Sequence, residues 1–152
     1  MKKVLFVCSG NTCRSPMAKA IFQKLLTSHK NLNYTADSAG LFTSEGLPAS
    51  EAAVIAMKEM EIDLSGHTSQ AISQFLMAEA DLVLTMTRQH HNYLIGLFPE
   101  KAHQTFTLGE FIGQPDQDIL DPYGMDQEAY QKCSQELMKV LIEVIKILLN
   151  EN

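Results

Sequence analysis

The chain has no long apolar run, no surplus of positive charge and only three cysteines among its 152 residues. Its apolar runs fall well short of the ~20 residues that a membrane-spanning helix requires. A net charge of -6 provides no long-range attraction for DNA or RNA. An odd number of cysteines without a paired framework is typical of a reducing compartment. We therefore expect a cytoplasmic protein that binds neither membranes nor nucleic acid.

The sequence also lacks internal repeats, low-complexity segments and any linker rich in proline, glycine and serine. Its length is that of one domain, which we expect to span residues 1–152. The apolar segment that follows Met1–Lys3 ends at Cys8, too early for a signal peptide, and is typical of a buried strand.

Short apolar segments alternate with amphipathic ones along the chain. The segments with the composition of strands are Val4–Val7, Tyr34–Ser38, Asp81–Met86 and Thr105–Leu108. Periodic apolar residues predict helices that begin at Ser15–Pro16, at Pro48, near Ile72, at Thr87 and at Asp126. This alternation predicts an α/β fold, in which helices cover both faces of a parallel sheet of about four strands.

A strand, a tight loop and a helix start are packed into the segment Val4–Pro16. Consecutive backbone amides in such a loop, next to a helix N-terminus, form a nest for an oxyanion. Gly10 and Asn11 tolerate the backbone angles that a tight loop needs, and Arg14 can close the nest with a bidentate fork. No Gly-Lys-Ser/Thr ending is present, so this is not a Walker loop. We interpret it as a phosphoryl-binding loop.

Cys8 stands at the base of this loop, at the carboxyl end of the first predicted strand, where α/β sheets bind their ligands. The amides, the helix end and Arg14 would stabilise its thiolate, and Ser15 could donate a further hydrogen bond. A thiolate that faces phosphorus is a nucleophile for a phospho-cysteine intermediate. An inert cysteine and a solvated arginine are the simpler interpretations of each residue alone; the strand, loop and helix together favour the catalytic one.

A displacement at phosphorus also needs a proton donor for the leaving group. The candidate is Asp121, in the turn-rich segment Asp118–Asp126. The proline after it holds its backbone extended, and a nearby phosphate dianion would favour the protonated carboxyl. The alternative is an Asp-Pro turn that merely leads into the last helix, and composition alone favours that alternative.

A resemblance to the low-molecular-weight protein tyrosine phosphatase family is carried by Val7-Cys8-Ser9-Gly10-Asn11-Thr12-Cys13-Arg14-Ser15-Pro16-Met17-Ala18 and by Asp121-Pro122-Tyr123-Gly124. The resemblance covers essentially the whole chain and implies a single phosphatase domain with a four-stranded parallel sheet. It implies Cys8 as the nucleophile, Arg14 on the phosphate, and Asp121 as acid and then as base. It also implies a substrate-binding role for Ser9, Gly10, Asn11, Thr12, Cys13, Ser15 and Tyr123.

Partners and auxiliary residues follow from the same resemblance. It implies phosphorylated proteins as substrates, inorganic phosphate as product and inhibitor, and no metal or other cofactor. His67 resembles the family's histidine near the loop asparagine, with a surface histidine as the alternative. Cys13 is either packed under the loop or forms a reversible disulfide with Cys8, and the resemblance favours the disulfide.

Position 12 bears on the substrate. Tyrosine-directed members usually carry isoleucine between the loop asparagine and the second cysteine, where it packs on the phosphotyrosine ring. Thr12 is shorter and offers a hydroxyl, which suits a polar guanidinium leaving group. The chain therefore resembles the bacterial protein-arginine-phosphatase branch. We expect phosphoarginine as the substrate, with phosphotyrosine as the close alternative.

Three other classes compete with a phosphatase. An arsenate reductase of similar fold would need further cysteines near residues 80 to 90, and residues 82–89 contain none. A phosphocarrier would keep Cys8 but has no need for Asp121, and a phosphoresidue-binding module would not turn substrate over. Of the remaining polar groups, Cys133 is expected in the core, and His90 and His91 on a solvated helix face.

Overall fold

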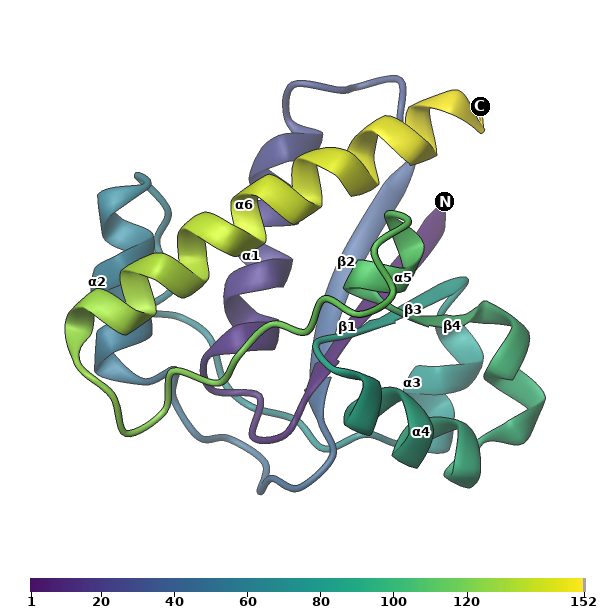
Figure 1. The fold of residues 1–152 in the computed structure, drawn as a ribbon, viewed down its shortest axis with the longest axis horizontal. Helices are drawn as coiled ribbons and strands as arrows, with labels where there is room; N and C mark the ends of the chain where they lie inside the picture. Colours follow the sequence, from purple (N-terminus) through teal and green to yellow (C-terminus); the bar gives the residue numbers. More distant parts are fainter. Residues whose placement is uncertain (152) are drawn as a thin grey trace.

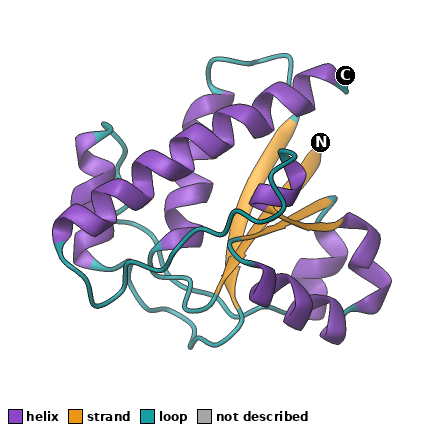
Figure 2. Cartoon of the chain, in the orientation of Figure 1, coloured by secondary structure: helices purple, strands orange, loops and turns teal. Residues whose placement is uncertain are grey.

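The computed structural model describes residues 1–151 and shows a parallel sheet between two layers of helices (Figures 1 and 2). The strands are β1 (Lys2–Cys8), β2 (Tyr34–Gly40), β3 (Leu82–Thr85) and β4 (Thr105–Thr107). They form one four-stranded sheet in the order β2-β1-β3-β4, and every neighbouring pair is parallel. The predicted fold class is confirmed.

Helices follow each strand and cover both faces of the sheet. They are α1 (Arg14–Leu26), α2 (Glu51–Glu59), α3 (Gln74–Glu79), α4 (Arg88–Leu97), α5 (Leu108–Phe111) and α6 (Gln127–Asn150), with a 3-10 segment η1 (Pro99–Gln104). In Figure 1, α6 crosses α1 and α2 on one side, while α3 and α4 lie on the other. Within residues 1–151, none of the helices combines the length and the apolar character needed to cross a bilayer.

The alternation of β1 side chains decides which layer each one joins. Val4, Phe6 and Cys8 belong to the core beneath α1 and α6. Leu5 and Val7 pack in a second cluster with residues of α3 and α4. The nucleophile candidate therefore points to the side of the sheet that carries α1.

Helix α6 contributes one long apolar face to the first layer. The periodic residues of this helix are buried: Tyr130, Cys133, Leu137, Leu141, Val144 and Leu148. Burial of each leucine or valine contributes about 1.5–3 kcal/mol before entropy is subtracted. The predicted stripe and the predicted cap, Asp126, are both confirmed, since the Asp126 carboxylate accepts from Ala129 N at 3.0 Å.

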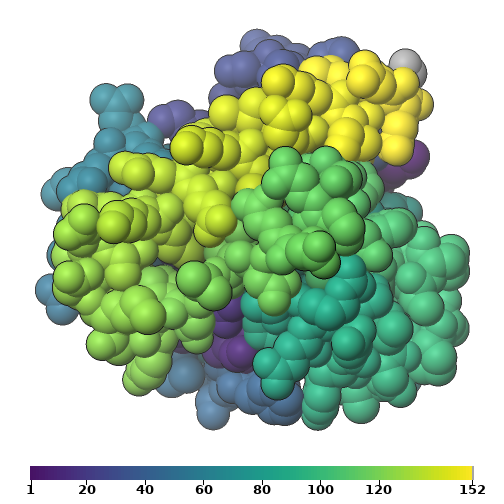
Figure 3. All heavy atoms as spheres, viewed as in Figure 1, coloured from purple at the N-terminus to yellow at the C-terminus, as the bar shows by residue number. Residues whose placement is uncertain are grey.

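The strand order shows at which end of the sheet a ligand is expected to bind. The chain leaves β1 to one side for β2 and later returns to the other side of β1 for β3. The loops after β1 and β3 therefore diverge at the switch point where α/β sheets bind ligands. In Figure 3 a small purple area from the N-terminal part of the chain is visible there, between teal and yellow-green segments.

Gly40, at the end of β2, permits the close packing of the loop that follows β1. A Cβ atom on Gly40 would lie 2.7 Å from the Ser9 carbonyl oxygen and 3.1 Å from Asn11 Cβ. Only glycine fits this approach without displacing backbone. The end of β2 thus forms a wall against which the loop is pressed.

Two helix starts differ from the prediction. Helix α1 begins at Arg14 rather than at Pro16, with Cys13 at the N-cap position and no side-chain cap, because the Ser15 hydroxyl is engaged in the loop. Helix α2 begins at Glu51 rather than at Pro48, because Ser50 caps it by accepting from Ala53 N at 3.3 Å.

Candidate active site

Asn11 is the anchor of the loop between β1 and α1. It adopts the left-handed conformation, with φ 55°, and is fully buried. Its Nδ2 donates to Ser15 Oγ at 2.8 Å and to Ser38 Oγ at 2.9 Å, and its Oδ1 accepts from Gln70 N at 2.9 Å. The side chain thereby joins the α1 end of the loop to β2 and to the segment that precedes α3.

His67 supports the same residue from outside. Its Nε2 lies 2.7 Å from the Asn11 carbonyl oxygen, which can only accept, so Nε2 carries the hydrogen. This contact favours the supporting position over the alternative of a surface histidine.

Cys8 lies at the base of the loop, 2% exposed, with Sγ 2.9 Å from Ser15 Oγ. Ser15 Oγ also accepts from Asn11 Nδ2, and because a Cys8 thiolate has no hydrogen, the Ser15 hydroxyl is the donor toward it. The hydrogen bond predicted between Ser15 and the Cys8 sulfur is present, and a thiolate at this position has a dedicated donor.

Arg14 is buried in the first turn of α1, with 4% of its surface exposed. Its Nη1 donates to the Ile119 carbonyl oxygen at 2.9 Å, and its Nη2 lies 3.4 Å from Asp121 Oδ2. Its Nε is buried and donates to no acceptor within residues 1–151. A buried guanidinium donor without a partner is costly, and a bound oxyanion would satisfy it.

Asp121 meets the loop from the far end of the chain. Its Oδ1 accepts from Tyr123 N at 3.1 Å and lies 3.7 Å from Cys13 Sγ, although Cys13 and Asp121 are 108 positions apart. Its side chain remains 46% exposed, so it is accessible to a substrate and to water. Tyr123 is exposed beside it.

Cys13 is held as a neutral thiol by this environment. Burial raises the pKa of its thiol to about 12, and the nearby Cys8 and Asp121 act in the same direction. The neutral thiol can donate its hydrogen to the Asp121 carboxylate. Cys133, in contrast, is a buried residue of α6 whose Sγ lies 4.0 Å from the Leu120 carbonyl oxygen, as expected for a core position.

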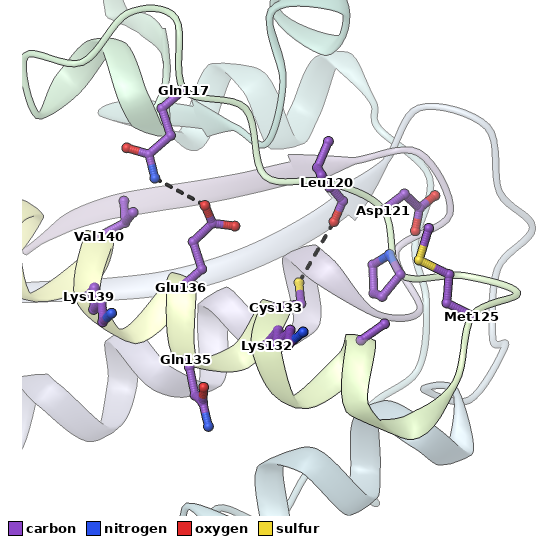
Figure 4. Close-up of a pocket in the computed structure, with 12 residues that line it drawn as sticks. Gln117, Leu120, Asp121, Met125, Lys132, Cys133, Gln135, Glu136, Lys139 and Val140 are labelled. Carbon is purple, nitrogen blue, oxygen red and sulfur yellow. Dashed lines mark hydrogen bonds between the residues drawn. The ribbon is translucent and has the colours of Figure 1, made fainter.

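Two hollows flank Asp121 and the loop. One, of about 590 Å³, lies between the segment 117–125 and α6, and of the predicted site residues it reaches only Asp121 (Figure 4). The other, of about 470 Å³, lies over the loop itself and is lined by Gly10, Thr12, Phe42, Thr43, Ser44 and Leu47. Thr12 is thus at the wall of the hollow that opens on the loop.

Phe42 forms part of that mouth, whereas Leu41 packs beneath it. The Phe42 ring is 62% exposed and meets Tyr93 edge-to-face, with ring centroids 4.9 Å apart. Leu41 packs against the second core cluster, beside α3 and α4. Phe42 therefore lines the pocket mouth and Leu41 belongs to the core.

The expectation that His90 and His91 lie on a solvated face is wrong. His90 is 6% exposed, and its Nε2 lies 2.8 Å from Ser9 Oγ. The His91 Nε2 lies 3.1 Å from the Thr105 carbonyl oxygen. Of the two, only His90 is buried; His91 is half-buried on the next position of α4. Ser38 and Gln70 are further contacts of the loop that the sequence did not predict.

The chain belongs to the family described as low molecular weight phosphotyrosine protein phosphatase, whose pattern it matches over residues 3–152. It is a phosphatase of the low-molecular-weight type, a hydrolase of phosphorylated proteins.

The chain is similar both to proteins named arginine phosphatases and to proteins named tyrosine phosphatases. The protein-arginine-phosphatase of Bacillus subtilis (strain 168) is 40% identical over 94% of each chain. A solved structure described as YwlE arginine phosphatase, a cysteine-to-serine mutant with a phosphorylated active-site serine, aligns with TM-score 0.90 and 39% identity over 96% of this chain and 95% of that one. The low molecular weight protein tyrosine phosphatase from T. tengcongensis aligns with TM-score 0.89 and 42% identity, over 96% of this chain and 99% of that one.

Proposed function

We propose that residues 1–152 form one domain that removes phosphate from phosphorylated protein residues through a phospho-cysteine on Cys8. The observation that carries this proposal is the state of three groups at the loop between β1 and α1. The Cys8 sulfur has its donor in Ser15, the buried Arg14 Nε has no protein acceptor, and the Asp121 carboxylate faces Arg14 at 3.4 Å. An arginine phosphatase phosphorylated on the serine that replaces its cysteine supports the same intermediate.

In the first step the Cys8 thiolate attacks phosphorus, and the bond from phosphorus to the leaving group breaks. The loop amides and Arg14 stabilise the peripheral oxygens, on which charge is spread in the transition state. Asp121, in its protonated form, gives its hydrogen to the departing atom. Ser15 stabilises the thiolate before the attack.

In the second step Asp121, now a carboxylate, takes a proton from water, and that water attacks the phospho-cysteine. The sulfur–phosphorus bond breaks, and inorganic phosphate and the thiolate are released. Because the product fits the same cradle as the phosphoryl group, inorganic phosphate is expected to inhibit competitively. The exposed Asp121 side chain is consistent with access of water in this step.

Phosphoarginine is the substrate that we propose for this site, with phosphotyrosine as the alternative. Thr12 lies on the wall of the hollow over the loop, where its hydroxyl can meet a polar leaving group. The relatives do not decide between these substrates, because an arginine phosphatase and a tyrosine phosphatase are 40% and 42% identical to this chain. The side chain at position 12 therefore carries the proposal.

Phosphate release from phosphoarginine and phosphotyrosine proteins tests this assignment directly. Wild type is expected to prefer phosphoarginine, and Thr12→Ile to shift the ratio of kcat/KM values toward phosphotyrosine by at least about tenfold, which corresponds to ~1.4 kcal/mol. The reason is that isoleucine removes the hydroxyl and adds a branched apolar surface for a ring.

Thr12→Val is the matched control, because valine removes the hydroxyl and keeps the shape. It is expected to lose activity on phosphoarginine without the gain on phosphotyrosine. A tenfold preference of the wild type for phosphotyrosine would overturn the substrate assignment and leave the phosphatase chemistry untouched.

Reversible oxidation is a further property that we propose for the loop. Peroxide would oxidise the Cys8 thiolate to a sulfenic acid, and Cys13 would displace hydroxide from it to give a disulfide and water. The wild type is then expected to lose activity in peroxide and to regain at least about four fifths with a dithiol, whereas Cys13→Ala should stay largely inactive because over-oxidation is irreversible. Activity before and after reductant is the measurement, with Cys133→Ala as the control that should recover like the wild type.

A further inference from the structure

His90 is a buried group that the chemistry proposed above does not use. It lies in the first turn of α4, and its Nε2 approaches Ser9 Oγ to 2.8 Å. Ser9 directly follows Cys8, and its carbonyl oxygen accepts from Phe42 N at 2.9 Å. The contact therefore joins the helix after β3 to the first peptide of the phosphoryl-binding loop.

The backbone of the turn that carries His90 is fixed from two sides. Thr87 Oγ1 accepts from His90 N at 3.1 Å. Asp118 Oδ1 accepts from Arg88 N at 3.0 Å, which ties the same turn to the segment that carries Asp121. The start of the His90 side chain is consequently held against the segment that carries Asp121, and the contact with Ser9 Oγ then orients the ring.

The environment keeps this imidazole uncharged at neutral pH. Burial lowers the pKa of His90 to about 4, assisted by the Arg14 guanidinium and opposed by Asp121 and Asp118. A neutral imidazole carries one hydrogen. Nδ1 is buried without a polar partner in the described chain, and a lone N–H there would be costlier than a lone acceptor. The hydrogen is therefore on Nε2, which donates to Ser9 Oγ.

We propose that His90 is a positioning residue of the phosphatase, which fixes the first peptide of the loop through Ser9 and leaves the Ser9 hydroxyl hydrogen free to donate to the phosphorylated substrate. The inference rests on the proposed role of the loop as the phosphoryl cradle. It does not depend on which phosphorylated residue is the substrate.

Substitutions of His90 test this role by the rate of phosphate release from a phosphorylated peptide. His90→Phe keeps the ring and removes the hydrogen bond, and is expected to lower kcat/KM by about five- to tenfold, the usual effect of one buried hydrogen bond. His90→Gln can still donate to Ser9 and is expected to stay within about twofold of the wild type. The matched control is His91→Gln, on the next residue of α4, which contacts Thr105 instead of the loop.

A double-mutant cycle with Ser9→Ala separates positioning from general packing. If the two side chains act through one contact, His90→Phe adds no further loss in the Ser9→Ala background. The proposal would be overturned if the loss of kcat/KM in the double mutant were the product of the two single losses. A His90→Phe enzyme within twofold of the wild type would overturn it as well. Failure of the phospho-cysteine chemistry would appear elsewhere, as turnover that survives in Cys8→Ser, so the two failures are distinguishable.

The pH dependence of unfolding gives an independent readout. The charged groups near His90 are Arg14 on α1 and Asp118 and Asp121 before α6; on its own helix, Arg88 pairs with Glu110 at 3.4 Å. An unfolded histidine takes up a proton near pH ~6.5, before the folded one does, so the wild type should lose stability as the pH falls from there toward 4. His90→Gln should lessen that loss in melting temperature, and an unchanged slope would count against a buried neutral imidazole.

Discussion

Cys8→Ser is expected to lower kcat by at least about 10³-fold, while the protein continues to bind phosphorylated substrate. The serine hydroxyl is ionised far less readily than a thiol, so the attacking atom is lost although the shape of the loop is kept. Ser15 and Asn11 still order the cradle, and Arg14 still binds the phosphoryl oxygens. Phosphate release and substrate binding, measured on the same preparation, check both halves of this expectation.

Cys133→Ser is the matched control for that experiment. Both cysteines are buried in the same layer of the protein, but Cys133 packs on α6, where a serine hydroxyl could donate to the Leu120 carbonyl oxygen. This variant is expected to retain activity within about threefold, as for a substitution outside the reacting groups. Turnover that persists in Cys8→Ser would exclude Cys8 as the nucleophile, and a stable phospho-cysteine in the wild type would indicate a phosphocarrier.

Asp121→Asn is expected to lower kcat by about 10²- to 10⁴-fold, the range that general acid–base catalysis contributes. Asparagine keeps the size of the side chain and can still accept from Tyr123 N, so the turn should persist. It cannot give a proton to the leaving group or take one from water. The loss should be smaller for an aryl phosphate whose leaving group is stable as an anion, because such a group departs without protonation.

Asp116→Asn, a short distance before Asp121 in the sequence and exposed to solvent, provides the comparison. Its steady-state rate should match the wild type for every leaving group. Equal losses for good and poor leaving groups in Asp121→Asn would contradict a role as acid in the first step. An unchanged kcat would remove Asp121 from the chemistry altogether.

Local patterns in the sequence were sufficient for the fold and for the identity of the loop. The apolar segments around Val4–Val7 and Asp81–Met86 contain the strands β1 and β3, because burial on both faces demands continuous apolar residues. Helix starts were less certain, since serine and proline can each serve at several positions of a first turn. Ser15 and Pro16 illustrate this: the helix is expected to begin there, whereas α1 begins at Arg14 with Cys13 at the N-cap position.

The contacts between the loop after β1 and other elements could not be predicted from the sequence, because they depend on the order of the strands. Ser38 and Gln70 reach Asn11 only because β2 lies beside β1 and the segment before α3 crosses the end of β2. His90 was expected on a solvated face because the His90-His91 pair lacks the spacing of metal ligands, whereas its Nε2 lies 2.8 Å from Ser9 Oγ, a residue 81 positions away. No pattern within a short window contains such information.

The bond from Arg14 Nη1 to the Ile119 carbonyl oxygen bears on how the two halves of the site are assembled. The Arg14 side chain binds the segment that carries Asp121, so the residue that binds phosphate and the proton donor form a single preorganised unit. The conformational entropy of bringing together residues from opposite ends of the chain is then lost once, during folding, and not again at each encounter with substrate. Binding energy from the rest of the substrate remains available for lowering the barrier.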